Sequence, residues 1–331
     1  MKRIKGLIIL AIILIALPIL FPNNYFITVV GTAVALHAVL AISLNLLMGY
    51  AGQISLGHAA FFGIGAYSSA ILTTQHQWNP LLSIGAGMLI TGIIAFVIAR
   101  PILKLKGHYL AMATLGFGII VSIILVQAGN FTGGPDGLSD IPPLALFGWT
   151  ISSDFHWYVV MSTVLLLIVW LVNNLIDSRS GRALRALHGS EVAAEMMGIN
   201  TTSVKTNVFV LSALIASFVG SLFAHQQAFI SPDSFSFFFS IELVTMVVLG
   251  GLASTYGAIF GALVLTFLPE LLVVFEDYEV MVFGGILMLM MIFMPQGLFV
   301  ALENLISRLY RNYFNPPLPV PASDGENHDV A

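Results

Sequence analysis

Glycines and polar side chains alternate between residues 45 and 67 of a chain that is otherwise strongly apolar. The candidates for binding chemistry in this stretch are Asn45, Gln53, Ser55, Gly57 and His58. Interrupted helices with polar groups at the break are typical of solute sites in transporters. Close helix packing at small residues is the alternative, and we favour it for Gly63 and Gly65. For Gln53, Ser55 and His58, a pathway and a structural turn both stay open.

A second segment, 248–262, echoes the first, because glycines and a polar cluster again separate two apolar runs. Gly250 and Gly251 are its candidates for a translocation pathway. The similarity is loose, so a degenerate internal repeat is only one interpretation and the predicted fold does not depend on it.

A third segment, 177–206, is the most polar stretch inside the chain, and it predicts a docking helix. Arg182 and Arg185 are three residues apart and share a helical face. Ser190 is a suitable N-cap for a short helix with acidic residues in its first turn. Methionines on the other side of that helix indicate docking into a groove of a partner. The candidates for coupling to that partner are Arg182, Arg185, Glu191, Ala193, Ala194, Met197 and Gly198.

The chemistry that the sequence lacks is equally informative. The chain contains no cysteine, which excludes disulfides, thiolate metal sites and cysteine nucleophiles. It has no Gly-x-Ser-x-Gly, no His-Glu-x-x-His and no phosphate-binding loop motif, so we expect no catalytic site, metal site or cofactor in this chain. Glu242 and Glu270 are the only candidates for acids within spans, and we expect both near the membrane interface rather than in a proton relay.

The composition indicates a membrane protein rather than a soluble one. Hydrophobic residues make up 58% of the 331 residues and charged residues 8%, against about a quarter charged in soluble domains. A helix needs about 20 apolar residues to cross a bilayer. We therefore predict an all-α polytopic bundle of eight to ten spans, with broken or re-entrant segments. The candidate spans are 6–21, 26–48, 58–75, 81–99, 108–127, 156–176, 207–226, 241–256, 258–275 and 280–300.

The distribution of charge tests this topology. With the N-terminus inside and alternating sides, the inside segments are 1–5, 49–57, 100–107, 177–206, 257 and 301–331. All twelve Lys and Arg residues fall in these segments. The charged residues of the outside segments are all Asp or Glu. In most membrane proteins the cytoplasmic loops are only enriched in Lys and Arg. Because the segregation of Lys and Arg is complete here, it supports the orientation with both termini inside.

Domain organisation follows from the same pattern. Residues 1–300 form one transmembrane domain with an external loop at 128–155 and a cytoplasmic loop at 177–206. Residues 301–331 form a tail that is Pro-rich and then acidic, which predicts partial disorder. The basic N-terminus and the apolar run 6–21 resemble a signal peptide, but the residues that follow are a poor cleavage site, so we expect a first span or an uncleaved anchor.

Taken together, these motifs resemble the LivM-type permease of branched-chain amino acid ABC transporters. The resemblance rests on residues 45–67, on Thr-Gly-Gly-Pro-Asp-Gly-Leu at 132–138 and on 181–200. In the C-terminal third it rests on Gly250-Gly251, Pro269-Glu270 and the Pro-Gln-Gly-Leu at 295–298. It covers roughly residues 28–300. One departure lies in the Glu-Ala-Ala-x-x-x-Gly loop of ABC importers, where Val192 replaces the glutamate and Glu191 precedes it.

The resemblance implies a heteromeric importer in a bacterial inner membrane. Its expected partners are a second, LivH-type permease, two cytoplasmic ATPase subunits that bind ATP, an external solute-binding protein and the lipid bilayer, with no nucleic acid. The implied cargo is leucine, isoleucine and valine. Three alternatives stay open at this point, namely a same-family permease for urea or short amides, a secondary transporter, and a passive channel.

Overall fold

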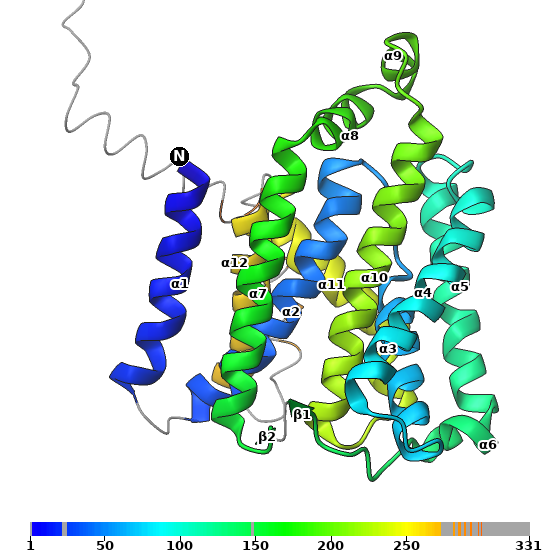
Figure 1. The fold of residues 1–331 in the computed structure, drawn as a ribbon. Helices are drawn as coiled ribbons and strands as arrows, with labels where there is room; N and C mark the ends of the chain where they lie inside the picture. Colours follow the sequence, from blue (N-terminus) through cyan, green and yellow to red (C-terminus); the bar gives the residue numbers. More distant parts are fainter. Residues whose placement is uncertain are drawn as a thin grey trace, which may run out of the picture.

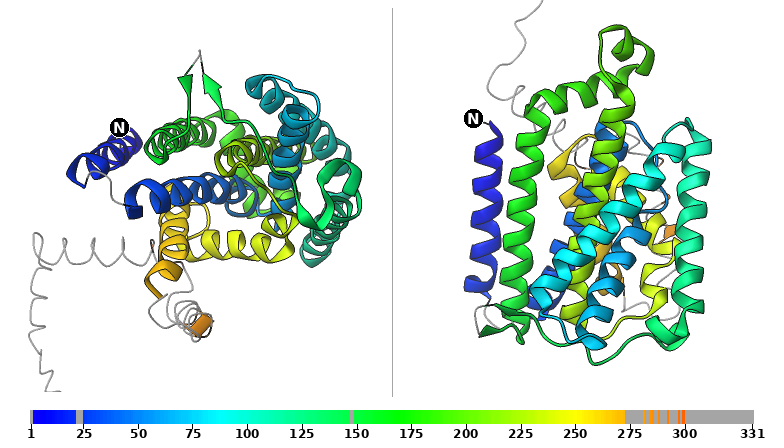
Figure 2. Two further views of the ribbon diagram at one scale, coloured as in Figure 1. Left: turned by 90° about the horizontal axis from the view of Figure 1, so that it is seen from below. Right: turned by 45° about the vertical axis from the view of Figure 1, so that its right-hand side comes forward.

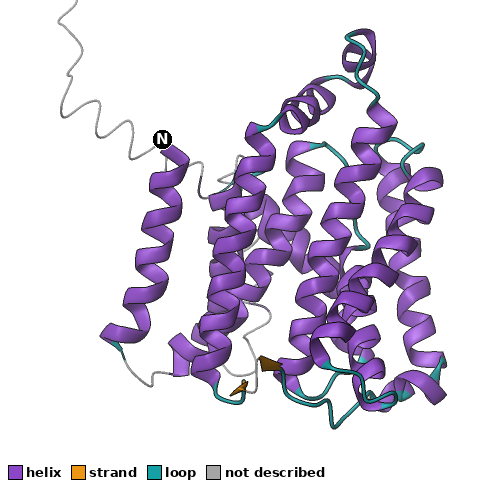
Figure 3. Cartoon of the chain, in the orientation of Figure 1, coloured by secondary structure: helices purple, strands orange, loops and turns teal. Residues whose placement is uncertain are grey.

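The computed structural model describes residues 2–21, 25–146 and 149–272, together with single positions between 281 and 299. Within these residues the chain is a bundle of helices, and its strands are confined to one small hairpin (Figures 1 and 3). Helices satisfy their own backbone hydrogen bonds, which is what a chain this apolar requires in lipid. The predicted all-α class is confirmed. The predicted span 280–300 and the tail 301–331 lie almost wholly outside the described residues.

The elements follow one another in a simple order along the chain. The α-helices are α1 (Lys2–Leu20), α2 (Gly31–Asn45), α3 (His58–Thr74), α4 (Pro80–Ile102), α5 (His108–Gln127), α6 (Gly129–Thr132), α7 (Asp154–Asp177), α8 (Arg179–Gly189), α9 (Glu191–Met196), α10 (Thr201–Gln227), α11 (Phe237–Gly250) and α12 (Thr255–Leu272). Two π-helical turns, Phe26–Val30 and Leu46–Tyr50, extend α2 at both ends, and the strands β1 (Ala145–Leu146) and β2 (Trp149–Thr150) pair antiparallel.

Six helices in the described residues are long and apolar enough to span a bilayer, namely Phe26–Tyr50, α4, α5, α7, α10 and α12. Two further apolar helices are shorter, namely Lys5–Leu20 within α1 and α11 (Phe237–Gly250), as expected from the short runs 6–21 and 241–256. The span predicted at 58–75 is α3, whose 17 residues are preceded by the non-helical stretch 51–57.

The centre of the bundle is formed by α2 and α10. Of the most apolar 18 residues of α10, 72% are buried inside the bundle, whereas the corresponding share for α5 is 22%. Seen along the bundle axis, α1 lies at one edge beside α7, and α4 and α5 lie at the other edge (Figure 2). The Tyr158 hydroxyl on α7 donates to the Leu14 carbonyl of α1 at 2.8 Å and ties that peripheral helix to the bundle.

Small residues allow the central helices to approach closely. A Cβ on Gly65 of α3 would lie 2.2 Å from the Ser217 carbonyl oxygen on α10, and one on Gly63 would lie 2.9 Å from Phe235. Both distances are shorter than any real carbon contact, so a larger residue would push the helices apart. The packing role favoured for these two glycines therefore agrees with the structure.

Basic residues gather at one end of the bundle, the end that carries the N-terminus and α8–α9 (Figure 1). We call it the basic end. Arg308 and Arg311 lie outside the described residues, and the other basic residues all lie on segments that begin, end or turn there. The hairpin, α6 and the acidic residues Asp136, Asp140 and Asp154 lie at the opposite end, which matches the predicted parity of the spans.

Three predicted boundaries differ from the observed helix ends. The spans expected at 241–256 and 258–275 are α11, which ends at Gly250, and α12, which begins at Thr255. The Ser254 hydroxyl accepts a hydrogen bond from the Gly257 amide at 3.0 Å, so it caps α12 and moves the break upstream. Similarly, α10 begins at Thr201 rather than 207, because the Asn200 side chain accepts from the Ser203 amide.

The topology has a direct test, because the chain lacks cysteine and any introduced thiol is unique. Asp154→Cys places an exposed thiol at the start of α7, and Arg185→Cys places one on α8 at the basic end. We expect a membrane-impermeant maleimide to label the two variants from opposite sides of intact cells and inverted vesicles. Labelling of both variants from one side would contradict the fold.

Candidate functional site

The first break in the bundle is the stretch 51–57, which leaves the basic end and descends to the start of α3. Its backbone is held by groups from other helices, as expected for irregular backbone inside a membrane protein. The Leu56 amide donates to the Thr114 hydroxyl on α5 at 3.0 Å, and the Ala59 amide donates to the Ser240 hydroxyl on α11 at 3.2 Å. This non-helical entry into a short helix is the broken segment that the sequence predicts.

The second break, 251–254, lies directly beside the end of α2. The Asn45 carboxamide joins the two, because its Oδ1 accepts from the Ala253 amide at 3.0 Å and its Nδ2 donates to the Ser254 carbonyl at 2.9 Å. Gly251 has a φ of 106°, and a Cβ on Gly250 would lie 2.0 Å from the Gly257 carbonyl oxygen. The structure therefore brings Asn45, Gly250 and Gly251 together at one place, although they are about 200 residues apart in sequence.

Three of the predicted pathway residues lie deeper in the core. His58 Nε2 is 2.7 Å from the Ser43 hydroxyl, and because that hydroxyl donates to the Leu40 carbonyl, the imidazole is the donor. Gly57 is buried so tightly that a Cβ would lie 2.3 Å from the Thr114 carbonyl oxygen. The Ser55 hydroxyl is buried and has no hydrogen-bond partner within the described residues.

Gln53 occupies a different environment, in the wall of a polar cavity of about 200 Å³ at the basic end. Residues 51–54 form one side, the loop between α4 and α5 forms another, and the ends of α8, α9 and α10 close it. The ionisable side chains in its walls are Lys106, His188, Glu191 and Lys205. The cavity thus joins the first break to the predicted coupling segment.

An ion pair fastens the coupling segment to the bundle at this cavity. Glu191 Oε1 lies 2.6 Å from Lys205 Nζ, whose side chain is 4% exposed, and Glu191 Oε2 lies 3.7 Å from Lys106 Nζ. Burial opposes the charge of Glu191, but the hydrogen bond and charge of Lys205, with Lys106, outweigh it and hold the pKa of this carboxyl below its usual range. The pair therefore stabilises the fold at neutral pH, and this contribution is lost as the pH falls through the lowered pKa.

Successive caps shape the segment between α7 and α10. The Ser178 side chain accepts from the Gly181 amide at the start of α8, and the Ser190 side chain accepts from the Ala193 amide at the start of α9. Gly198, with a φ of 79°, turns the chain back toward α10. The N-cap and terminating glycine predicted for the short helix are both observed.

The two short helices present exposed side chains beyond the bundle. Ala194 is buried and anchors α9, while Val192, Met196 and Met197 are 60%, 84% and 82% exposed. On α8, Leu184 and Leu187 face inward. The other predicted coupling residues that are exposed on this surface are Arg182, Arg185, Ala193 and Gly198. Within the described residues, Val192, Met196 and Met197 therefore form an uncovered apolar patch on and just after α9, beside the exposed Glu195.

Other functional groups were not predicted from the sequence. Lys106 was expected only as a topology signal, Lys205 only as one of the basic residues of the inner loop, and Thr114 and Ser240 were not singled out. Lys205 lies one turn inside α10, and a lysine so close to an apolar run is the one local signal that could have indicated a partner. Of the predicted membrane acids, Glu242 is half-buried and Glu270 is exposed. Within the described residues no group of three His, Asp or Glu side chains could hold a metal.

Comparison with known proteins places these features in a family. A family model described as the permease component of branched-chain amino acid transport systems matches residues 8–294. The high-affinity branched-chain amino acid transport system permease LivM of Salmonella typhimurium is 35% identical over 292 residues, covering 81% of this chain and 69% of that protein. LivH of the same organism is 26% identical over 79% of this chain and 90% of LivH, and BraD of Pseudomonas aeruginosa is 26% identical over 79% of this chain and 91% of BraD.

No solved structure gives a significant match. The family model covers most of the chain, and the polytopic helical fold and the paired breaks agree with a membrane permease. The chain belongs to the family of branched-chain amino acid transport permeases.

Proposed function

We propose that this chain is a pore-forming subunit of an ABC importer that moves leucine, isoleucine and valine across a bacterial inner membrane. The observation that carries the proposal is the group of exposed apolar side chains Val192 and Met196 of α9 and Met197 just after it, which lies beyond the bundle between α8 and α10. A soluble partner with an apolar groove would bury this surface, as amphipathic helices are bound in many complexes. We take that partner to be a cytoplasmic ATPase, which would hold the ATP that this chain has no motif to bind.

The rest of the assembly follows from the same proposal. A second permease of the LivH type completes the pathway, a second ATPase subunit serves it, and an external solute-binding protein delivers the amino acid. The basic end faces the cytoplasm, in agreement with the bias of Lys and Arg toward that side. Both termini then lie in the cytoplasm.

The pathway of the amino acid passes the two breaks. Asn45, Gln53, Ser55, Gly57, His58, Gly250 and Gly251 form or support its lining, and the hydrogen-bonded His58 acts as a support rather than a proton carrier. The polar cavity beside Gln53 is the cytoplasmic end of this route. Because α9 closes that cavity through Glu191, movement of the ATPase against α9 changes access to it.

The first test concerns docking. Met196→Glu/Met197→Glu keeps the fold, because both side chains are exposed, but places charge where an apolar groove must close. We expect uptake and substrate-stimulated ATP hydrolysis in proteoliposomes of the whole importer to fall at least tenfold, with unchanged membrane insertion. The matched control is Ser152→Glu at the opposite end, and normal uptake by the double variant would contradict the docking proposal.

The same preparation separates the rival mechanisms. Disabling the nucleotide site of the partner ATPase stops uptake if the importer is ATP-driven. A secondary transporter or passive channel would continue to transport after that change. Competition among leucine, urea and short amides for uptake tests the cargo, and the names of the relatives above favour leucine.

The second test concerns the ion pair. Glu191→Gln leaves the buried Lys205 ammonium with no counter-charge, which destabilises proteins by several kcal/mol when the site is fully buried; since Glu191 is partly exposed, we expect about 1–2 kcal/mol. Removing both charges in Glu191→Gln/Lys205→Met should restore most of the thermal stability in detergent but not the coupling of hydrolysis to uptake. If the losses of stability in Glu191→Gln and Lys205→Met simply add up in the double variant, the ion pair contributes nothing to stability.

The third test concerns access to the cavity. A thiol at Gln53→Cys lies in the polar wall, so its rate of reaction with a small charged maleimide should differ several-fold between nucleotide-free and ATP-bound importer. Ser152→Cys, exposed at the opposite end of the bundle, is the control and should react at one rate in both states. Equal rates at position 53 in both states would exclude a change of access there.

A further inference from the structure

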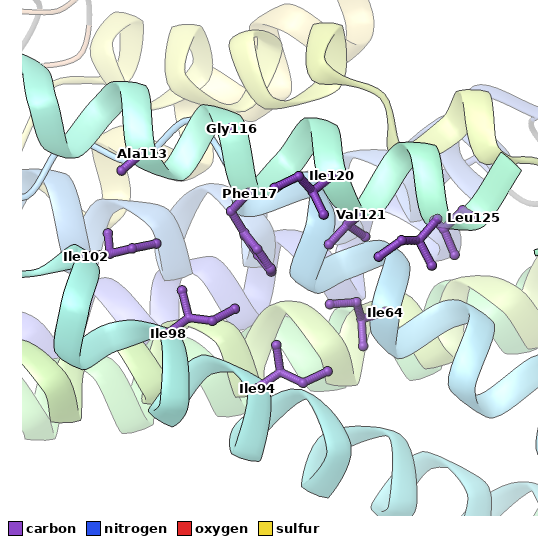
Figure 4. Close-up of a pocket in the computed structure, with 11 residues that line it drawn as sticks. Ile64, Ile94, Ile98, Ile102, Ala113, Gly116, Phe117, Ile120, Val121 and Leu125 are labelled. Carbon is purple, nitrogen blue, oxygen red and sulfur yellow. The ribbon is translucent and has the colours of Figure 1, made fainter. Parts of the chain in front are cut away.

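A long apolar groove separates α4 and α5 on the flank of the bundle that is least covered by protein. Its volume is about 620 Å³. Ile94, Ile98 and Ile102 of α4 face Phe117 and Ile120 of α5 across it, and Ile64 of α3 lies at its floor (Figure 4). All of its lining residues are apolar or glycine. Such a groove offers nothing to a polar amino acid and requires an apolar occupant.

The dimensions of the groove suit an acyl chain. Along α5 it runs from Ala113 to Leu125, which at 1.5 Å per residue is about 18 Å. One leaflet of a bilayer contributes about half of a 30 Å hydrocarbon core. The length and the wholly apolar lining of the groove therefore fit one acyl chain.

Positive charge stands at one end of this groove. The two helices that form its walls meet in the loop 103–107 at the basic end, where Lys104 and Lys106 are exposed. Ile102, the last residue of α4, belongs to the lining. Arg100 does not contribute, because it is half a turn away on α4 and its guanidinium lies 4.9 Å above the Phe96 ring. Basic pockets between spans at the cytoplasmic side attract anionic lipid head groups.

We propose that this groove is a binding site for an anionic phospholipid, with one acyl chain between α4 and α5 and the phosphate held by Lys104 and Lys106. The bound chain replaces the direct packing that α4 and α5 lack and fixes their separation. Lys106 also faces Glu191, so the head group lies next to the polar cavity and the coupling arm. The proposal depends on the chain spanning the membrane and not on its cargo.

The test uses the importer complex in nanodiscs of phosphatidylcholine with a minor fraction of phosphatidylglycerol. Native mass spectrometry counts the phosphatidylglycerol that stays bound after transfer to detergent. Lys104→Gln/Lys106→Gln should lower this retention about fivefold per lysine, and Lys5→Gln/Arg100→Gln, which removes two charges at the same end but away from the groove, should leave it unchanged. Equal retention in both variants would overturn the head-group assignment.

The acyl chain is tested separately by filling the groove. A Cβ on Gly116 would meet no atom within 4 Å, and the same is true of Gly85 on α4, which does not line the groove. Gly116→Leu should therefore expel the lipid, whereas Gly85→Leu should retain it. An indole introduced by Ile120→Trp should be quenched by brominated acyl chains in the assembled importer. Quenching seen only when the second permease is omitted would mean that a subunit covers the groove, and the proposal would be wrong.

Discussion

Backbone groups that leave a helix inside a bilayer must find partners within the protein, and this requirement organises the centre of the permease. Each unsatisfied group would cost several kcal/mol. The first break meets it with hydroxyls from Thr114 and Ser240, and the second meets it with the carboxamide of Asn45. The helices that carry these side chains are therefore fixed in place by the breaks that they support, and small residues such as Gly65 let them come close enough to do so.

The sequence predicts the parts of this fold that depend on local chemistry. Apolar run length locates the spans, the distribution of Lys and Arg gives their parity, and the Ser190 cap with Gly198 gives the coupling helix. It fails at 241–275, where the whole stretch is apolar and a cap at Ser254 decides the boundary. It also fails where a contact is long-range, because nothing near Asn45 in the sequence indicates Ala253, and nothing near Glu191 indicates Lys106.

Charge serves two purposes at the basic end. Most of the cations there are exposed and follow the topology rule, but Lys205 is buried and has a specific partner in Glu191. In this chain the glutamate stands one position before the place that it has in the importer pattern. Its contact with Lys205 explains this departure. At position 191 the carboxylate follows the Ser190 cap and reaches inward to α10, while position 192 is 60% exposed and carries valine on the outer surface.

The Asn45 carboxamide has a mechanical consequence. Its two hydrogen bonds, 2.9 and 3.0 Å long, reach adjacent residues of the second break from a single planar group at the end of α2. Such bonds need donor–acceptor distances of about 2.7–3.2 Å, so sliding one segment past the other strains both bonds at once. The end of α2 and the second break are therefore coupled at this point, although about 200 residues separate them in the sequence.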